Sequence, residues 1–279
     1  MKEFLISCLQ STPFFPWVIL TLSFFVIEEF VQPPTAEPST VANRLLNCAC
    51  GLVVCATALA LKPLLYTELS FVTRHFGQGL ISIKAFPDNP ALTLGLAVGA
   101  FLIVQDFCFY LWHRLQHNVR MLWHIHAVHH SERSLNSTSY MRQSWIDGLV
   151  QLLCVNVPCV LILNVSLEAQ YDAYLIAAAW NFFGHSNLRL QLGFMTPVLT
   201  GPQLHRLHHS LLAKHQDKNF AQFFPFWDLL FGTYVPPERH EFPPTGLHQE
   251  TRIESLRLMV SWPFRQWLRH FTRQARENA

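Results

Sequence analysis

Residues 91–117 read ALTLGLAVGAFLIVQDFCFYLWHRLQH, a long apolar run that ends in two histidines. Up to Trp112 the run carries a single charged side chain, Asp106, and a helix of about 20 residues crosses a hydrocarbon core of roughly 30 Å. His113 and His117 follow at a spacing of four, which places both imidazoles on one face of that helix. The stretch therefore predicts a membrane-spanning helix with metal ligands at its end.

The composition of the whole chain agrees with a membrane protein. Of the 279 residues, 51% are hydrophobic and 14% are charged, a balance too apolar for an ordinary soluble domain. Further apolar runs of spanning length occupy residues 4–27 and 45–66. Residues 146–183 are interrupted by polar residues between Asn164 and Glu168, which predicts a helical hairpin that turns there. We therefore expect an all-α, polytopic helical membrane protein with about 4–5 membrane segments.

Residues 4–27 have a second interpretation as a signal peptide, because an apolar run follows Lys2. However, Glu3 adds a negative charge to the start of the chain, and Glu28 and Glu29 stand where the small residues of a cleavage site would be. We therefore expect this segment to be a retained membrane anchor.

The histidines are concentrated in short boxes. Ten of the 15 fall into one H-x-x-x-H box, two H-x-x-H-H boxes and two single positions. Spacings of three and four bring imidazoles to one face of a helix, so each box predicts a convergent cluster. Imidazole suits iron, zinc and copper, and about ten nitrogens exceed the three or four protein ligands of a single zinc ion. The pattern predicts a two-metal site built from His113, His117, His126, His129, His130, His185, His205, His208, His209 and His215.

Two other classes of protein also use histidine clusters. A membrane zinc hydrolase would need a general base, yet H-E-x-x-H is absent and no glutamate lies inside a box. A metal-transport protein would place ionisable residues inside its spans, whereas these histidines follow the apolar runs. Both classes stay open as alternatives.

The predicted hairpin returns the chain to the membrane face that it left, so residues 113–144 and the tail after Phe183 share one face. Lysine and arginine follow the same division, because four of the twenty lie in residues 113–144 and eleven lie after Phe183. The positive-inside tendency places this face in the cytoplasm. We therefore expect an integral, multi-pass protein of a bacterial inner membrane or the endoplasmic reticulum, with a cytoplasmic histidine-rich metal-binding cap.

The order of the motifs resembles a known family. H-R-x-x-H, H-x-x-H-H, a histidine after an aromatic pair, H-R-x-H-H and the stretch HQDKNFAQFFPFWDLLFGTY at residues 215–234 are similar to the fatty acid hydroxylase/sterol desaturase superfamily of membrane di-iron enzymes. The similarity covers about residues 106–234. It implies a centre of two iron ions that uses O2 to remove hydrogen from a lipid C–H bond, with the ten histidines above as iron ligands.

The resemblance implies hydroxylation of a sterol, fatty-acyl or ether lipid, with desaturation as the alternative, because both reactions begin with the same hydrogen abstraction. The chain lacks a G-x-G-x-x-G loop and an iron–sulfur pattern, so a separate cytochrome b5, ferredoxin or reductase must supply electrons. The expected partners are a lipid substrate, the membrane and this electron donor, and no nucleic acid.

Two features depart from the family pattern. His124 is out of register with the second box, and we leave it out of the ligand set. The stretch SYMRQSW at residues 139–145 keeps Arg142 but lacks the R-F-H-P sequence of many members. Its R-Q-S is similar to that of alkylglycerol monooxygenases, which is too short a likeness to identify the substrate.

Three carboxylates are candidates to orient the ligands, because ligating histidines usually donate their second ring N–H to a carboxylate or a carbonyl. They are Asp106, Asp217 and Asp228. Arg114 and Arg206 each follow the first histidine of a box and could pair with these carboxylates or anchor at lipid headgroups.

The chain divides into an N-terminal membrane-anchor region at 1–90, a catalytic region at 91–240 that resembles the family, and a basic amphipathic tail at 241–279. The tail mixes aromatic residues with arginines, so it could lie in the lipid interface or pack on the protein's own surface. Seven cysteines lie in or beside apolar runs without a C-x-x-C pair, and we expect them to be buried hydrophobes.

Overall fold

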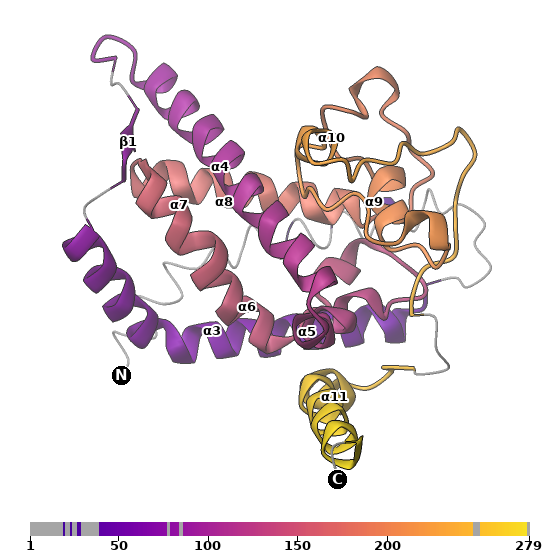
Figure 1. Cartoon of the computed structure of the whole chain (residues 1–279). Coiled ribbons are helices and arrows are strands. Elements are labelled where there is room, and N and C mark those ends of the chain that lie inside the picture. Colours follow the sequence, from indigo (N-terminus) through magenta and orange to yellow (C-terminus); the bar gives the residue numbers. More distant parts are fainter. Residues whose placement is uncertain are drawn as a thin grey trace.

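The computed structural model describes residues 19, 23, 27, 28, 39–76, 79–83, 86–247 and 252–277, with the backbone alone at 62–76 and 275–277. The described part is mostly helical (Figure 1). The predicted anchor at residues 4–27 lies almost entirely outside the described residues. The structure therefore tests the fold from α3 onward.

Three helical segments are long and apolar enough to cross a membrane. They are Val41–Leu61 within α3 (Val41–Phe76), the whole of α4 (Pro90–Asn118), and Trp145–Ile162. The last combines α6 (Trp145–Gln151), a π-helical turn (Leu152–Asn156) and α7 (Val157–Ile162). These are three of the predicted apolar segments, and they are the candidate spans within the described residues.

The predicted turn between two helices is confirmed, although only the first of them is a candidate span among the described residues. After α7 the chain makes two extended residues, β2 (Leu163–Asn164), and returns as α8 (Leu167–Gly184). Ser166 caps α8, because its hydroxyl accepts a hydrogen bond from the Ala169 N–H at 3.2 Å. β2 pairs in parallel with β1 (Ile81–Ser82), which ties the turn to the segment before α4.

The core lies where α4 crosses α8 and the π-helical turn. Alanines recur every four residues on the buried side of α8, which lets the two helix backbones approach closely (Figure 1). The core cluster consists of Phe101, Leu102, Cys108, Trp112, Val155, Cys159, Leu163, Ala173 and Ala177. The helix ends that carry the histidine boxes are thereby held beside one another.

The remaining elements gather around the C-terminal ends of α4 and α8 (Figure 1). They are α5 (Arg120–His130), α9 (Pro202–His208), α10 (Phe226–Leu230), α11 (Leu256–Glu277) and short 3-10 turns at Ser137–Met141, Gly193–Met195 and Ala213–His215.

Helix α11 packs one face against the protein and exposes apolar side chains on the other. Met259 is buried in a cluster with Cys50, Val128 and Ile253, so one face packs on α3 and α5. Leu268 on the opposite face is 66% exposed. The structure therefore shows the packed side that one interpretation of the tail predicted, and it leaves an apolar stripe on the other side.

Candidate metal centre

Nine of the ten predicted ligands meet in two groups. The five-histidine group consists of His113, His117, His126, His130 and His208, and the four-histidine group consists of His129, His185, His205 and His209. Within each group, one potential ligand atom per residue lies within 4.8 Å of all the others. The boxes therefore converge as their spacing predicted, and the structure adds the division between the groups.

Helix geometry explains the division. His129 and His130 are consecutive on α5, and residues that follow one another on a helix point about 100° apart. The second box consequently contributes His126 and His130 to one group and His129 to the other. The third box divides in the same way, because His208 joins the five-histidine group and His209 the four-histidine group.

The facing ring nitrogens lie at distances typical of a coordination shell. In the five-histidine group, His126 Nε2 lies 2.9 Å from His113 Nε2 and 3.1 Å from His130 Nε2. In the four-histidine group, His185 Nε2 lies 3.1 Å from His129 Nε2 and 3.0 Å from His205 Nε2. Two ligands at right angles on a metal with bonds of about 2.0–2.1 Å would be about 3 Å apart.

Backbone carbonyls determine which nitrogen carries the proton. His185 Nδ1 donates to the Asn181 carbonyl at 2.8 Å, and a carbonyl oxygen can only accept, so this ring carries its proton on Nδ1 and has a bare Nε2. His129 Nδ1 lies 3.2 Å from both the Arg142 carbonyl and the side-chain nitrogen of Gln143. The bare Nε2 of His185 lies 3.1 Å from His129 Nε2 and 3.0 Å from His205 Nε2.

Burial keeps these imidazoles neutral. It lowers the pKa of His185 to about 4 and that of His129 well below its usual value. Burial and the neighbouring histidines also lower the pKa values of His205 and His209. Neutral rings whose Nε2 atoms converge at 3.0–3.2 Å in a buried site fit a cation, because their lone pairs can be directed at it together. The donor set therefore fits a bound metal ion.

The five-histidine group is oriented by the loop after the third box. His117 Nδ1 lies 3.2 Å from the Asp217 carboxylate, His208 Nδ1 donates to the Lys218 carbonyl at 2.8 Å, and His113 Nδ1 donates to the Phe220 carbonyl at 2.7 Å. Asp217 adopts a left-handed backbone, with φ of 55°, a conformation that aspartate tolerates better than most residues. Asp217 thus contacts a histidine as the sequence analysis expected.

Asp106 and Asp228 contact the same loop, and neither makes a hydrogen bond to a histidine among the described residues. Asp106 accepts the backbone N–H groups of Gln222, Phe223 and Phe224 at 3.1, 2.8 and 2.8 Å. Asp228 accepts those of Phe220 and Ala221 at 2.8 and 2.9 Å. Both carboxylates therefore fix the loop whose Phe220 carbonyl binds His113, so they act one step away from the group.

The two arginines of the boxes have other partners than these carboxylates. Arg114 donates to the Tyr110 hydroxyl at 3.2 Å. Arg206 donates to the Pro243 carbonyl at 2.9 Å, and its guanidinium stacks 3.7 Å from the ring centroid of Phe242. Arg206 is therefore a buried structural residue and not a headgroup anchor.

His215 lies outside both groups. Its Nδ1 is 2.9 Å from the Ser210 hydroxyl and its Nε2 is 3.2 Å from a Glu241 carboxylate oxygen. Its Nε2 makes no hydrogen bond despite this distance within the part of the chain that the structure describes, and its position outside both groups does not support the expectation that His215 is a ligand. His124 joins neither group, as its register predicted.

Sequence reasoning overlooked Asp147. Its carboxylate accepts hydrogen bonds from Gln116 Nε2 at 2.8 Å and Trp112 Nε1 at 3.3 Å, and it lies 3.8 Å from His126 Nδ1. The signal was present, because Asp147 is a carboxylate in an apolar run, the criterion that singled out Asp106.

Apolar helices and buried histidine groups are together the features of membrane-bound histidine-box proteins. Comparison with known proteins agrees, because the fatty acid hydroxylase family model matches residues 98–233. Residues 98–233 belong to the fatty acid hydroxylase/sterol desaturase superfamily, as the order of the motifs predicted.

The names of the curated relatives refer to several different lipids. An alkylglycerol monooxygenase of Homo sapiens is 32% identical over 225 residues, which cover 81% of this chain and 47% of that protein. An ornithine lipid hydroxylase of Rhizobium tropici is 30% identical over 58% of this chain and 48% of its own length. A Delta(7)-sterol 5(6)-desaturase of Gibberella zeae is 28% identical over 81% of this chain and 61% of its own length.

The chain thus spans about half the length of the curated relatives it matches. No solved structure matches the chain.

Proposed function

We propose that this protein is a membrane-bound oxidoreductase that uses two iron ions, O2 and external electrons to hydroxylate a lipid C–H bond. The observation that carries the proposal is the bare Nε2 of His185, which lies 3.1 Å from His129 Nε2 and 3.0 Å from His205 Nε2 in a buried site. The family of residues 98–233 supports iron and O2 as the chemistry.

The nine grouped histidines would hold the metals, with one ion in the five-histidine group and one in the four-histidine group. When bound, the two irons would supply the activation of O2 and the removal of hydrogen from the substrate. The protein's own contribution is to present neutral imidazoles, to direct the Nε2 atoms of His113, His185 and His208 inward through hydrogen bonds from Nδ1 to backbone carbonyls, and to exclude water by burial.

Hydroxylation is our first choice and desaturation by the same centre is the alternative. Two of the relatives above are named as a hydroxylase and a monooxygenase, and one as a sterol desaturase. We propose a lipid substrate, because the names of all three relatives refer to lipids and the site lies at the ends of apolar helices.

The proposed setting is a multi-pass protein with about 4–5 membrane segments and its metal centre on the cytoplasmic face. The exposed stripe of α11 supports contact with lipid on this side. Phe264, Leu268 and Phe271 are 47%, 66% and 56% exposed, and arginines flank them. A basic helix with an exposed apolar stripe suits an anionic bilayer surface. A cytochrome b5, ferredoxin or reductase would dock at the same face to deliver electrons.

Metal content tests the proposal first. The protein is expressed anaerobically with iron and zinc both supplied, purified in detergent and analysed by mass spectrometry. We expect about two irons per chain, and we expect His129→Ala to lose metal while His124→Ala, the matched control outside both groups, retains it. One zinc ion, or no metal, would contradict the proposal in favour of the hydrolase or transport classes.

Turnover tests the reaction. Membranes that contain the protein are incubated with 18O2 and a reductant, and the extracted lipids are searched for products by mass spectrometry. A lipid that gains one 18O atom indicates hydroxylation, and one that loses two hydrogens indicates desaturation. No product in membranes that hold the iron-loaded protein would count against both reactions.

A further inference from the structure

Three buried polar residues lie on the N-terminal side of the family-matched region. Glu28, Arg44 and Asn47 are 0%, 2% and 0% exposed. None of the three was predicted from the sequence to support the metal centre, and the family match begins only at residue 98. Buried charged and amide groups are costly unless they have partners, so their contacts show what they do.

Glu28 joins three separate segments. One carboxylate oxygen accepts the backbone N–H groups of Ser137 and Asn187 at 2.8 and 2.6 Å. The other accepts the Ser137 hydroxyl at 2.8 Å and pairs with Arg44 at 2.7 Å. Glu28 thus holds the loop after the second box against the loop after α8.

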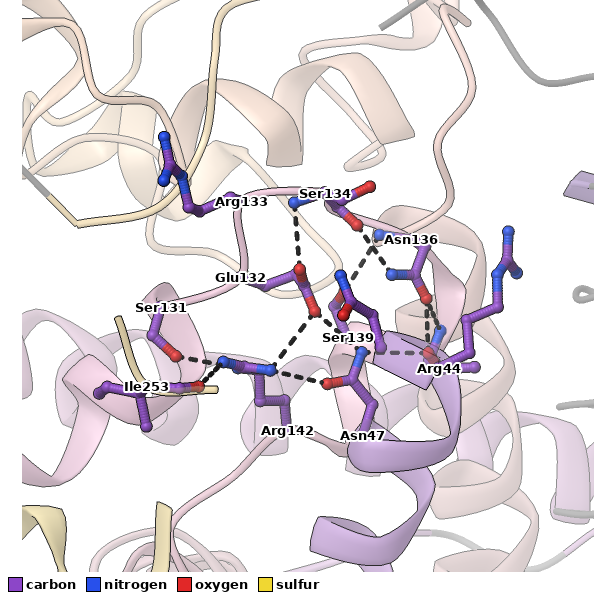
Figure 2. Close-up of polar contacts among 12 residues, drawn as sticks. Arg44, Asn47, Ser131, Glu132, Arg133, Ser134, Asn136, Ser139, Arg142 and Ile253 are labelled. Atoms are coloured by element: carbon purple, nitrogen blue, oxygen red, sulfur yellow. Dashed lines mark hydrogen bonds and ion pairs between the residues drawn. The ribbon is translucent and has the colours of Figure 1, made fainter. Parts of the chain in front are cut away.

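Asn47 lies one helical turn after Arg44 on α3 and contacts the same loop (Figure 2). Its amide nitrogen donates to Glu132 at 3.0 Å and to the Thr138 hydroxyl at 3.2 Å. Its oxygen accepts from the Arg142 guanidinium at 3.1 Å. Figure 2 shows that Arg142 also donates to the Ser131 hydroxyl and to the Ile253 carbonyl, at 2.9 and 2.5 Å.

These hydrogen bonds connect Glu28 and Asn47 to residues that contact or closely follow members of the four-histidine group. The Arg142 carbonyl lies 3.2 Å from His129 Nδ1, and Asn47 holds the side chain of Arg142. Asn187, which Glu28 holds, follows His185 by two residues. The side-chain oxygen of Asn187 accepts from Arg206, which follows His205, at 3.3 Å.

The five-histidine group has different supports. The contacts described above come from Asp217, from the carbonyls of Lys218 and Phe220, and from the neighbouring Asp147. None of these residues contacts Glu28 or Asn47 through a hydrogen bond that the structure describes. Asn47 also donates a hydrogen bond to Glu132, which follows His130 of the five-histidine group by two residues. We infer that Glu28 is a positioning residue for the four-histidine group, and that Asn47 supports the same group through Arg142. This inference rests on the proposed binding of one metal by each group.

A double-mutant cycle on metal content tests the inference. His130→Ala damages the five-histidine group and leaves one metal in the other, whereas His205→Ala does the reverse. Glu28→Ala is combined with each background, and the chelator concentration that removes half of the remaining metal is measured on the purified full chain.

We expect Glu28→Ala to lower that concentration about tenfold or more in the His130→Ala background and to leave it unchanged in the His205→Ala background. Asn47→Ala should lower it more in the His130→Ala background than in the His205→Ala background. Glu28→Gln keeps one oxygen for the Ser137 and Asn187 amides and should lie between wild type and Glu28→Ala. Glu168→Ala, at an exposed position on α8, is the matched control.

Equal losses in both backgrounds would overturn the inference, because they would indicate a general loss of stability. No loss in either background would overturn it as well. If Glu28→Ala is not recovered folded by circular dichroism, Glu28→Gln and Asn47→Ala take its place in the cycle. The metal content of the wild-type protein distinguishes the two proposals. If it binds two metals and the cycle fails, only the positioning role is rejected. If it binds fewer than two metals, both proposals are rejected.

Discussion

Asp106→Ala measures how strongly one carboxylate holds the loop that orients the five-histidine group. The substitution removes the acceptor of three backbone N–H groups, those of Gln222, Phe223 and Phe224, at 3.1, 2.8 and 2.8 Å. These amides are partly buried, so we take the lower end of the cost of an unsatisfied group, about 1 kcal/mol each. The sum is a loss of about 3 kcal/mol in the free energy of unfolding.

The assay is thermal unfolding of the metal-free protein in detergent, followed by circular dichroism, because metal binding would otherwise add to the stability. For a chain of this size, about 3 kcal/mol corresponds to a decrease of roughly 6–12 °C in Tm. Asp106→Asn retains one acceptor oxygen and should lose about half as much. Asp88→Ala, at an exposed position before α4, is the matched control and should not change Tm.

The refuting result is a Tm of metal-free Asp106→Ala within about 2 °C of wild type. Loss of metal without loss of stability would mean that Asp106 acts on the metal centre directly. Its hydrogen bonds to the loop would then contribute little to the free energy of unfolding.

Three further predictions concern other residues. His215→Ala should retain both metals and His208→Ala should lose one by mass spectrometry, because only His208 belongs to a group; equal losses would restore His215 as a ligand. Asp147→Asn should weaken metal binding about 10–100-fold in a chelator titration, since it removes the carboxylate charge beside His126; unchanged affinity would make Asp147 purely structural. In nanodiscs, a spin label at Leu268 should collide with O2 more often than with a water-soluble nickel chelate, and a label at exposed Arg239 should show the opposite preference. More frequent collisions of the Leu268 label with the chelate would place α11 in water.

Local pattern predicted much of this fold. The apolar run at 91–112 became α4, and the polar interruption near Asn164 became the turn of the hairpin. Both predictions depend on the length and polarity of one segment, which a sequence shows directly. The convergence of His126, His129 and His130 was equally predictable, because their spacing fixes their positions on a single helix.

Contacts between distant segments were not predictable. Whether Asp106 faces a histidine or a backbone amide depends on where residues 222–224 fold, more than a hundred positions away. His215 looked like a ligand because it follows the third box closely, yet the fold places it outside both groups, beside Ser210 and Glu241. Glu28 was considered only as a boundary of the apolar run, since nothing in the sequence pairs it with Ser137 or Asn187.

The adjacent pairs His129–His130 and His208–His209 have a mechanical consequence. The two histidines of each pair are consecutive in the chain, but their side chains belong to different groups. The distance between the groups is therefore limited by the covalent backbone and by the geometry of a helical turn. The ring centroids within the pairs are 5.7 and 5.3 Å apart. These two pairs, one on α5 and one at the end of α9, therefore restrict the distance between the groups and their relative orientation. A single residue inserted within either pair would therefore disrupt both groups at once, whereas a substitution at one position would disrupt only one.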